Sequence, residues 1–292
     1  MALDVTSAKL ICAALSLGAD FARTVTLGRQ SFGLTESTLN NLTSRLHLAS
    51  SAKQLAKEKF SEPFFRAIGA ETVDSVDISN YEGASVLHDM NLPIPANLER
   101  RYSVLFDGGC LQHIFNLSQA LKNTMKMLEL GGHFLQVAVA NNFMGFGFWQ
   151  LSPEVLYRVF STENGFKTLA VLVREVDENW HEHRPWYLAR DPAQVGWACE
   201  LVNKRRTVIA TIAQRVEVRP IFGSPPQQSL FERAWQDSEA SAAQLRPRRL
   251  IELARRFIPH SVEHAVRSPY NPKCFVRLRE DDLLCGRFPE LA

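Results

Sequence analysis

Three short runs decide the fold: SVDISNYEGASVLHDMN (75–91), YSVLFDGGCLQHIFN (102–116) and LKNTMKMLELGGHF (121–134). The apolar segments of the first two runs end on acids, at Asp77, Asp89 and Asp107. In an open α/β sheet, ligands bind at the carboxyl ends of the strands, so acids placed there face the ligand. This order of strands and acids predicts a ligand site along one edge of a sheet.

The third run predicts a helix that ends at Gly131 and Gly132 and leads into the strand HFLQVAVA (133–140). Upstream, RTVTLG (23–28) is typical of a first strand, and a second strand is expected at residues 72–77. The segment between these two strands is longer than a single crossover helix needs. We therefore expect additional helices there.

Local signals place several further elements. Thr35 is the predicted N-cap of one inserted helix, and Pro63 belongs to the first turn of another. Downstream, KTLAVLVREV (167–176) predicts a strand. CELVNKRRTVIATIAQRV (199–216) predicts an antiparallel hairpin that turns at residues 203–206.

These elements predict an α/β protein with a Rossmann-like, mostly parallel sheet, an antiparallel edge hairpin and a helical C-terminal extension. We expect the sheet domain over residues 1–225 and the extension over residues 226–292. The extension contains the basic amphipathic stretch RPRRLIELARRFI (246–258). It favours a helix docked on its own domain over one that binds a membrane or nucleic acid.

Composition excludes several functions. The formal net charge of +2 gives no global field that would select nucleic acid or an anionic membrane. The apolar run LICAALSLGA (10–19) favours a buried first helix over a signal peptide, because Asp4 lies where a basic region is expected. The five scattered cysteines favour a reducing cytoplasm over a disulfide framework or a zinc site. The sequence leaves the oligomeric state open.

A weak metal motif occurs at His181, Glu182 and His183. Alternating histidines share one face of a strand, which some metal sites use. The sequence offers no identifiable third ligand, so we expect no metal.

The succession of strands that end on acids, followed by helix, Gly-Gly and strand, resembles the second half of a class I S-adenosylmethionine-dependent methyltransferase. The resemblance extends over roughly residues 22–231. It implies S-adenosylmethionine as the cofactor and a small molecule as the methyl acceptor.

The resemblance also implies roles for single residues. Asp77 would bind the ribose hydroxyls, Asp89 and Met90 would lie at the adenine, and Asp107 and Gly108 would lie beside the transferred methyl group. Of the family's glycine-rich loop, only Gly28 stands where expected. Arg29, just after the first strand, either binds the cofactor's carboxylate in a bidentate pair or is an ordinary surface residue.

Longer words resemble a bacterial group of such enzymes that is associated with polysaccharide and natural-product gene clusters. They are YEGASVLHDMN, DGGCLQHIFN, NNFMGFGFWQLSPEVLYRVF and PPQQSLFERAW. The acceptor is then expected to be a sugar or a secondary metabolite. Two positions depart from the group: Gln112 replaces a glutamate, and Phe146 replaces a histidine.

The same resemblance places His113 against the acceptor, where an imidazole can serve as the base near neutral pH. Asp107 is the second catalytic candidate, and we expect it to orient His113 or the cofactor. The acceptor pocket is expected in the aromatic loop NNFMGFGFWQ (141–150), because small-molecule sites combine apolar walls with a few amides. Its predicted contacts are Gln112, Asn141, Asn142, Phe146 and Gln150.

Two alternatives remain at this point. The incomplete glycine loop and the departures at Gln112 and Phe146 favour a non-catalytic relative that acts as a binding or scaffold protein. The second alternative is an enzyme that uses the same cofactor pocket for another reaction.

Overall fold

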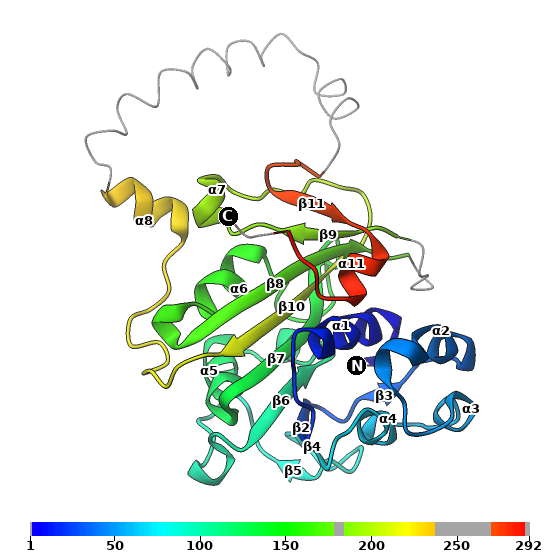
Figure 1. The fold of residues 1–292 in the computed structure, drawn as a ribbon. Helices are drawn as coiled ribbons and strands as arrows, with labels where there is room; N and C mark the ends of the chain where they lie inside the picture. Colours follow the sequence, from blue (N-terminus) through cyan, green and yellow to red (C-terminus); the bar gives the residue numbers. More distant parts are fainter. Residues whose placement is uncertain (1, 178–183, 237–269, 290–292) are drawn as a thin grey trace.

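The computed structural model describes residues 2–177, 184–236 and 270–289. Within these ranges the main sheet has nine strands in the order β11-β9-β8-β10-β7-β6-β2-β4-β5 (Figure 1). In that order their bounds are Phe275–Leu278, Trp186–Ala189, Phe166–Glu175, Thr207–Arg215, Leu128–Asn141, Tyr102–Asp107, Arg23–Leu27, Thr72–Asp77 and Val86–Leu87. A small parallel sheet joins β1 (Ala2–Leu3) to β3 (Ser31–Phe32).

Strand directions confirm the predicted class. The strands β5, β4, β2, β6 and β7 are parallel to one another. β10 is antiparallel to both β7 and β8, and β9 is antiparallel to both β8 and β11. All described strands of this sheet except β9 and β10 therefore run in one direction, and the antiparallel pairs lie toward one edge.

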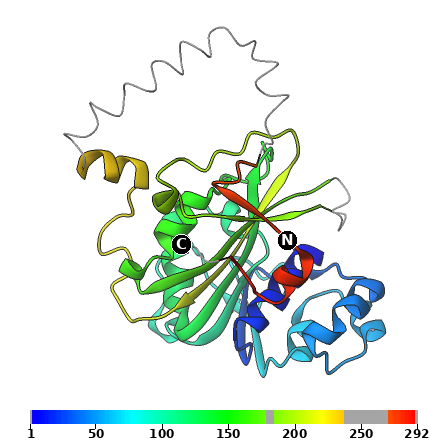
Figure 2. The same ribbon diagram turned by 45° about the horizontal axis from the view of Figure 1, so that its top comes forward.

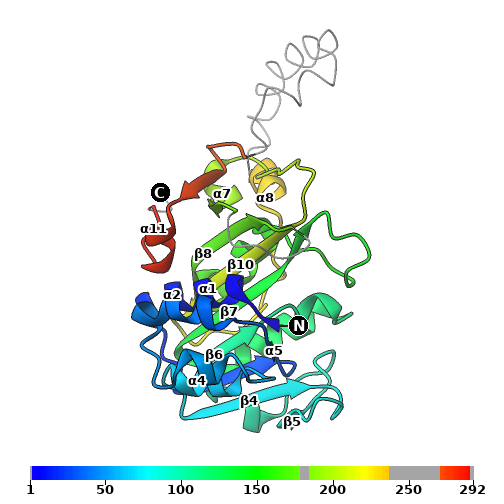
Figure 3. The same cartoon turned by 90° about the vertical axis from the view of Figure 1, so that its right-hand side faces the viewer.

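Helices cover both faces of this sheet (Figure 3). The longer ones are α1 (Val5–Ser16), α2 (Glu36–Leu46), α5 (Leu117–Met127), α6 (Pro153–Val159) and α8 (Ser229–Gln236). The shorter ones are α3 (Ala52–Leu55), α4 (Glu62–Ala67), α7 (Pro192–Val195) and α11 (Glu280–Leu284). Turns of 3-10 helix occur at Ala96–Leu98, Leu111–His113 and Thr162–Asn164. No helix in the described ranges is long and apolar enough to cross a membrane.

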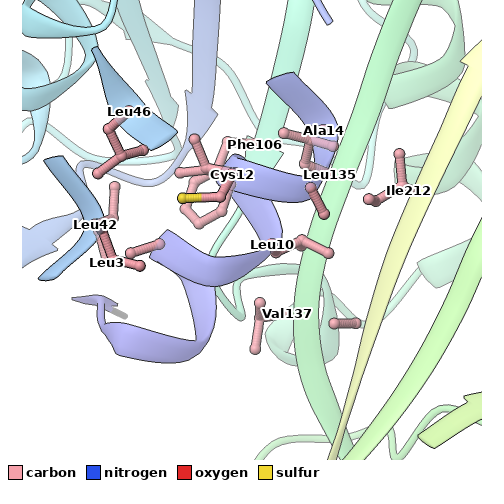
Figure 4. Close-up of a cluster of buried hydrophobic side chains, with 14 of the residues drawn as sticks. Leu3, Leu10, Cys12, Ala14, Leu42, Leu46, Phe106, Leu135, Val137 and Ile212 are labelled. Carbon is pink, nitrogen blue, oxygen red and sulfur yellow. The ribbon is translucent and has the colours of Figure 1, made fainter. Parts of the chain in front are cut away.

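Two hydrophobic clusters explain why these strands form the centre of the molecule. Val104 and Phe106 of β6 pack with α1, α2 and α4, whereas Leu105 between them packs with α5 and α6. Figure 4 shows the first cluster, in which Leu10 and Cys12 of α1 lie near Phe106 and Leu135. Because both faces are covered, β6 is buried along its whole length, as expected for parallel strands.

The inserted helices between the first two strands are confirmed. α2, α3 and α4 all lie between β2 and β4 in the chain. Thr35 is the N-cap of α2, and its hydroxyl accepts a hydrogen bond from the N–H of Thr38. Pro63 lies in the first turn of α4. The apolar run near the N-terminus forms α1, as predicted.

The predicted end of the third-run helix is wrong. α5 ends at Met127 and β7 begins at Leu128, so Gly131 lies inside the strand, with φ +85°. A glycine cap is not needed because buried Arg215 of β10 donates hydrogen bonds to the carbonyls of Met125 (3.3 Å) and Leu128 (2.6 Å). This cap comes from a residue far away in sequence.

The predicted hairpin over residues 199–216 is wrong in its pairing. An antiparallel strand does occur at Thr207–Arg215, but residues 199–206 form no strand. β10 pairs instead with β7 and β8. The charged turn therefore connects a loop to a strand inserted between two others.

The C-terminal part contains the helix α8, and the chain then returns to the main sheet. β11 pairs with β9, and α11 lies against α1 (Figure 2). Two contacts fix α11: Lys9 forms an ion pair with Glu280 at 2.7 Å, and the Ser16 hydroxyl donates to the carbonyl of Leu284. The strand β11 is an element that the sequence did not predict, and a division after residue 225 stays a prediction. The basic stretch 246–258 lies outside the described residues.

Candidate functional site

The carboxyl ends of the parallel strands gather the predicted site residues at one edge of the sheet. In the register of these strands, Leu27 lies beside Val76, and Asp77 lies beside Leu87. Asp107 ends β6 next to β2 and β7. The negative charges of Asp107 and Asp77 both act on the Cys110 thiol, whose pKa is raised chiefly by burial and further by these charges.

Asp77 presents a carboxylate at the end of β4. Its Oδ1 accepts a hydrogen bond from the N–H of Ser79 at 3.0 Å. Its Oδ2 accepts none from the described residues. The next side chain, Ile78, is apolar and 68% exposed. A free carboxylate oxygen thus lies next to an exposed apolar surface.

Asp89 follows β5 and is held in a tight turn. Its Oδ1 accepts hydrogen bonds from the backbone N–H (2.9 Å) and side-chain amide (2.8 Å) of Asn91, and these bonds lower the pKa of Asp89. Met90, by contrast, packs into the hydrophobic core. Asn91 also accepts from the N–H of Asn116, which joins this turn to the loop after β6.

Asp107 is fully buried and holds the loop that follows β6. Its carboxylate accepts hydrogen bonds from the N–H groups of Gly109, Cys110 and Leu111 and from the side-chain amide of Gln136. Burial raises the pKa of Asp107, against the effect of these donors. The carboxylate is therefore engaged in positioning the loop.

Gly28 and Arg29 follow β2. Gly28 has φ +65° and donates its N–H to the carbonyl of Val76 at 2.7 Å. The Arg29 guanidinium pairs with Glu62 at 2.6 Å and donates to the carbonyl of Glu82 at 2.7 Å. It also lies 3.8 Å from the centroid of the Phe60 ring. Arg29 thus already has a carboxylate partner within the chain.

Gln30 is a site residue that the sequence did not reveal. It is fully buried, and its amide nitrogen donates to the carbonyl of Leu27 at 2.5 Å. Its Oε1 has no hydrogen-bond partner among the described residues. A side chain at Gly108 would collide with this oxygen, so Gly108 is the residue that lets the two strand ends approach. Nothing in the motif GRQSFG signals such a buried amide.

Gln112 joins the loop after β6 to the loop after β7. Its side-chain Oε1 accepts the N–H of Val139 at 3.1 Å. Its backbone carbonyl accepts the N–H groups of Phe148 (2.8 Å) and Trp149 (3.2 Å). The side chain is buried, so its observed contacts are within the protein.

Amides also fix the loop after β7. Asn141 and Asn142 both donate from their side chains to the side-chain oxygen of Asn203, at 2.9 Å each. Gln150 accepts the N–H of Phe143 at 3.0 Å and so closes the loop on itself. These hydrogen bonds connect the loop to Asn203 and join its two ends.

His113 lies at the surface where the two loops meet. Its ring centroid is 6.0 Å from that of Phe146. Partial burial lowers the pKa of His113, so the imidazole is neutral near pH 7. A neutral imidazole can accept a proton.

The structure thus brings Asp77, Asp89, Asp107, His113 and Phe146 to one edge of the sheet. Met90 packs into the core instead. The predicted acceptor-binding amides Gln112, Asn141 and Gln150 form hydrogen bonds within the loops. The weak metal motif at 181–183 lies outside the described residues. Within the described ranges there is no group of three His, Cys, Asp or Glu side chains that could hold a metal ion.

No family model matches the chain, and no curated protein matches it. Solved structures with similar folds include a SAM-dependent methyltransferase of Thermotoga maritima, at 12% identity and TM-score 0.36, covering 72% of this chain and 88% of that one. A second, from Mesorhizobium loti, has 12% identity and TM-score 0.31, with 73% and 100% covered. The trans-methyltransferase CalH, in complex with SAH, has 11% identity and TM-score 0.37, with 71% and 55% covered.

Proposed function

We propose that this protein transfers a methyl group from S-adenosylmethionine to an oxygen or nitrogen nucleophile of a small molecule, a sugar or a secondary metabolite. The observation that carries the proposal is the pair of carboxylates, Asp77 and Asp89, at the ends of neighbouring parallel strands. Beside them lies the Asp107 loop, which carries His113.

The residues present fit most of this cofactor. Oδ2 of Asp77 is available to accept hydrogen bonds from ribose hydroxyls, and charge-assisted bonds of this kind are about twice as strong as neutral ones. The exposed Ile78 offers an apolar surface for a flat base. Arg29 fits its predicted role only if Glu62 shares or releases it.

When bound, S-adenosylmethionine supplies a methyl group on a sulfonium and is released as S-adenosylhomocysteine. The remaining work falls to residues of this chain. Because displacement at carbon needs alignment, the fixed loops at Gln112 and Gln150 hold the acceptor in one orientation. His113 accepts the proton that the nucleophile loses, and Asp107 positions the loop that carries His113.

The proposed cellular setting is the cytoplasm. All five cysteines are free thiols in the structure, which suits a reducing compartment.

Titration calorimetry with S-adenosylhomocysteine tests the cofactor assignment. Asp77→Ala should weaken binding about ten-fold or more, the effect of losing hydrogen bonds to a charged group. Asp20→Ala is a matched control, because Asp20 accepts the N–H two residues ahead at 3.0 Å, as Asp77 does, but it precedes β2. Equal affinity in a folded Asp77→Ala protein would remove the ribose assignment. Absence of any binding by the unmutated protein would favour the non-catalytic alternative.

A further inference from the structure

Two loops at the carboxyl edge expose aromatic rings side by side. Phe115 from the loop after β6 is 71% exposed, and Phe146, Phe148 and Trp149 from the loop after β7 are 48%, 65% and 39% exposed. We propose that these four residues, the aromatic platform, bind the methyl acceptor, and that this acceptor is an uncharged molecule with a flat, weakly polar face. This inference rests on the proposed function and narrows its substrate class.

The platform is built by contacts between the two loops. The Phe115 and Phe148 rings meet edge to face, with centroids 5.7 Å apart and an interplanar angle of 83°. The Trp149 indole donates its N–H to the carbonyl of Ile114 at 3.0 Å. Ring contacts and hydrogen bonds therefore hold the exposed rings in place, so that binding a ligand requires little further ordering of the site.

Gly147 allows the loops to come this close. A Cβ at Gly147 would lie 2.8 Å from the carbonyl oxygen of Gln112 and 3.2 Å from Nδ1 of His113. The backbone between Phe146 and Phe148 thus packs directly on the loop that carries the proposed base. An acceptor that lies on Phe146 has His113 at its edge, with the ring centroids of these two residues 6.0 Å apart.

The two loops carry no charge of their own, which favours a neutral acceptor over an anionic one. Residues 108–116 and 142–150 contain no Asp, Glu, Lys or Arg, and His113 is neutral near pH 7 because its pKa is lowered. Arg206 lies 5.5 Å from the centroid of the buried Phe143 ring, and that ring packs on Phe146 of the platform with centroids 5.5 Å apart, so Arg206 is the cation to test against an anionic acceptor. A buried or half-buried phosphate or carboxylate needs a paired cation. The carboxylates of Asp77 and Asp89, at the same edge of the sheet, would repel such an anion.

Exposed rings of this kind bind flat apolar faces. Offset and edge-to-face ring contacts stabilise by more than the area they bury, and large exposed apolar patches mark binding sites. Two sources present such a face together with a hydroxyl nucleophile: an aromatic alcohol and a neutral sugar ring. The shared chemistry is the absence of charge, and the probes below distinguish the two sources.

Calorimetry in the presence of saturating S-adenosylhomocysteine provides the test. The probes are two matched pairs: 1-naphthol with 1-naphthyl phosphate, and methyl glucoside with glucose 6-phosphate. In at least one pair the neutral member should bind about ten-fold tighter than its phosphate, which identifies the source. Phe148→Ala should weaken that binding roughly two- to ten-fold, as expected for loss of a ring contact.

Phe231→Ala is the matched control, because Phe231 of α8 is also exposed (56%) and also pairs with another ring, that of Trp235. It should leave probe binding unchanged. Phe115→Ala repeats the platform test from the other loop.

Three results would overturn the inference: tighter binding of a phosphate that is lost in Arg206→Gln, equal effects of Phe148→Ala and Phe231→Ala, or binding of neither neutral probe. In the last case, self-association that Phe148→Ala abolishes would assign the platform to an interface between copies. Binding of S-adenosylhomocysteine alone is measured first. Its absence would contradict the proposed function, whereas its presence without neutral-probe binding would contradict only the acceptor class.

Discussion

Oε1 of Gln112 accepts the backbone N–H of Val139 at 3.1 Å, and this buried hydrogen bond ties the loop after β6 to the last part of β7. The same residue accepts two further N–H groups through its backbone carbonyl. Gln112, which replaces a glutamate of the bacterial group that the sequence resembles, is thus part of the framework that joins two loops.

The first prediction concerns this hydrogen bond. Gln112→Ala leaves the buried N–H of Val139 without its acceptor and should cost about 1–3 kcal/mol of unfolding free energy. Urea denaturation measures the loss. Gln214→Ala is the control, because the Gln214 side chain also hydrogen-bonds to the backbone, donating to the carbonyl of Gly131, but at an exposed site, where the change should stay within about 0.5 kcal/mol. Equal losses of unfolding free energy in both variants would show that the buried Gln112 hydrogen bond stabilises the protein no more than an exposed one.

The second prediction isolates the contact between the loops. Gly147→Ala and Gly145→Ala both place a side chain at positive φ, at +91° and +82°. Only Gly147→Ala also meets Gln112 O, at 2.8 Å, whereas nothing lies within 4 Å of a Cβ at Gly145. Thermal unfolding should therefore show a larger loss of stability for Gly147→Ala, and acceptor turnover should fall more. Indistinguishable variants would mean that the loops separate at little cost.

The third prediction concerns His113. If the imidazole accepts the acceptor's proton, His113→Ala should lower turnover by about 10²–10⁴ while calorimetry shows unchanged cofactor affinity. Since its pKa is lowered by partial burial, the acidic limb of the rate profile should lie below pH 6.5 and disappear in the variant. His113→Gln should not restore the rate, because an amide does not titrate. If His113→Ala keeps turnover within a few-fold of the unmutated protein, His113 is not the base, and the loop contributes only by aligning the acceptor.

The fourth prediction concerns stability and pH. His133 of β7 is buried, neither ring nitrogen has a partner among the described residues, and burial lowers its pKa. The unfolded chain therefore takes up the proton more readily. Stability contributed by neutral His133 is present above about pH 6.5 and is lost as pH falls below it, by up to about 1.4 kcal/mol per unit. The unfolding free energy, measured by denaturation at several values from pH 7.5 to 5.5, should depend less on pH in His133→Leu than in the unmutated protein. An equal dependence on pH in both proteins would show that His133 is not its source.

The sequence predicted those parts of the fold that follow from local pattern. The strand β6 is buried along its whole length and is mostly apolar, so its end at Asp107 could be predicted from the chain. The strand β4 is only partly buried, and its end at Asp77 follows the buried residues Ser75 and Val76. Helix starts at Thr35 and Pro63 carry their own signals.

What the sequence did not predict depends on distant partners. The end of α5 is capped by Arg215, and β10 pairs with strands far from it in the chain. The buried amides of Gln30 and Gln112 have the same side chain as any surface glutamine. Only the packing of other loops around them determines that they are structural.

The contact of α11 with α1 has a consequence for biosynthesis. Lys9 and Glu280, which pair at 2.7 Å, are about 270 residues apart in the chain. At a translation rate of about 5–20 residues per second, roughly 15–50 seconds separate their synthesis. During that interval the nearly buried ammonium of Lys9 lacks its carboxylate. The helix α1 therefore waits for α11 before its final packing can form, and a ribosome-bound chain exposes this surface to chaperones until then.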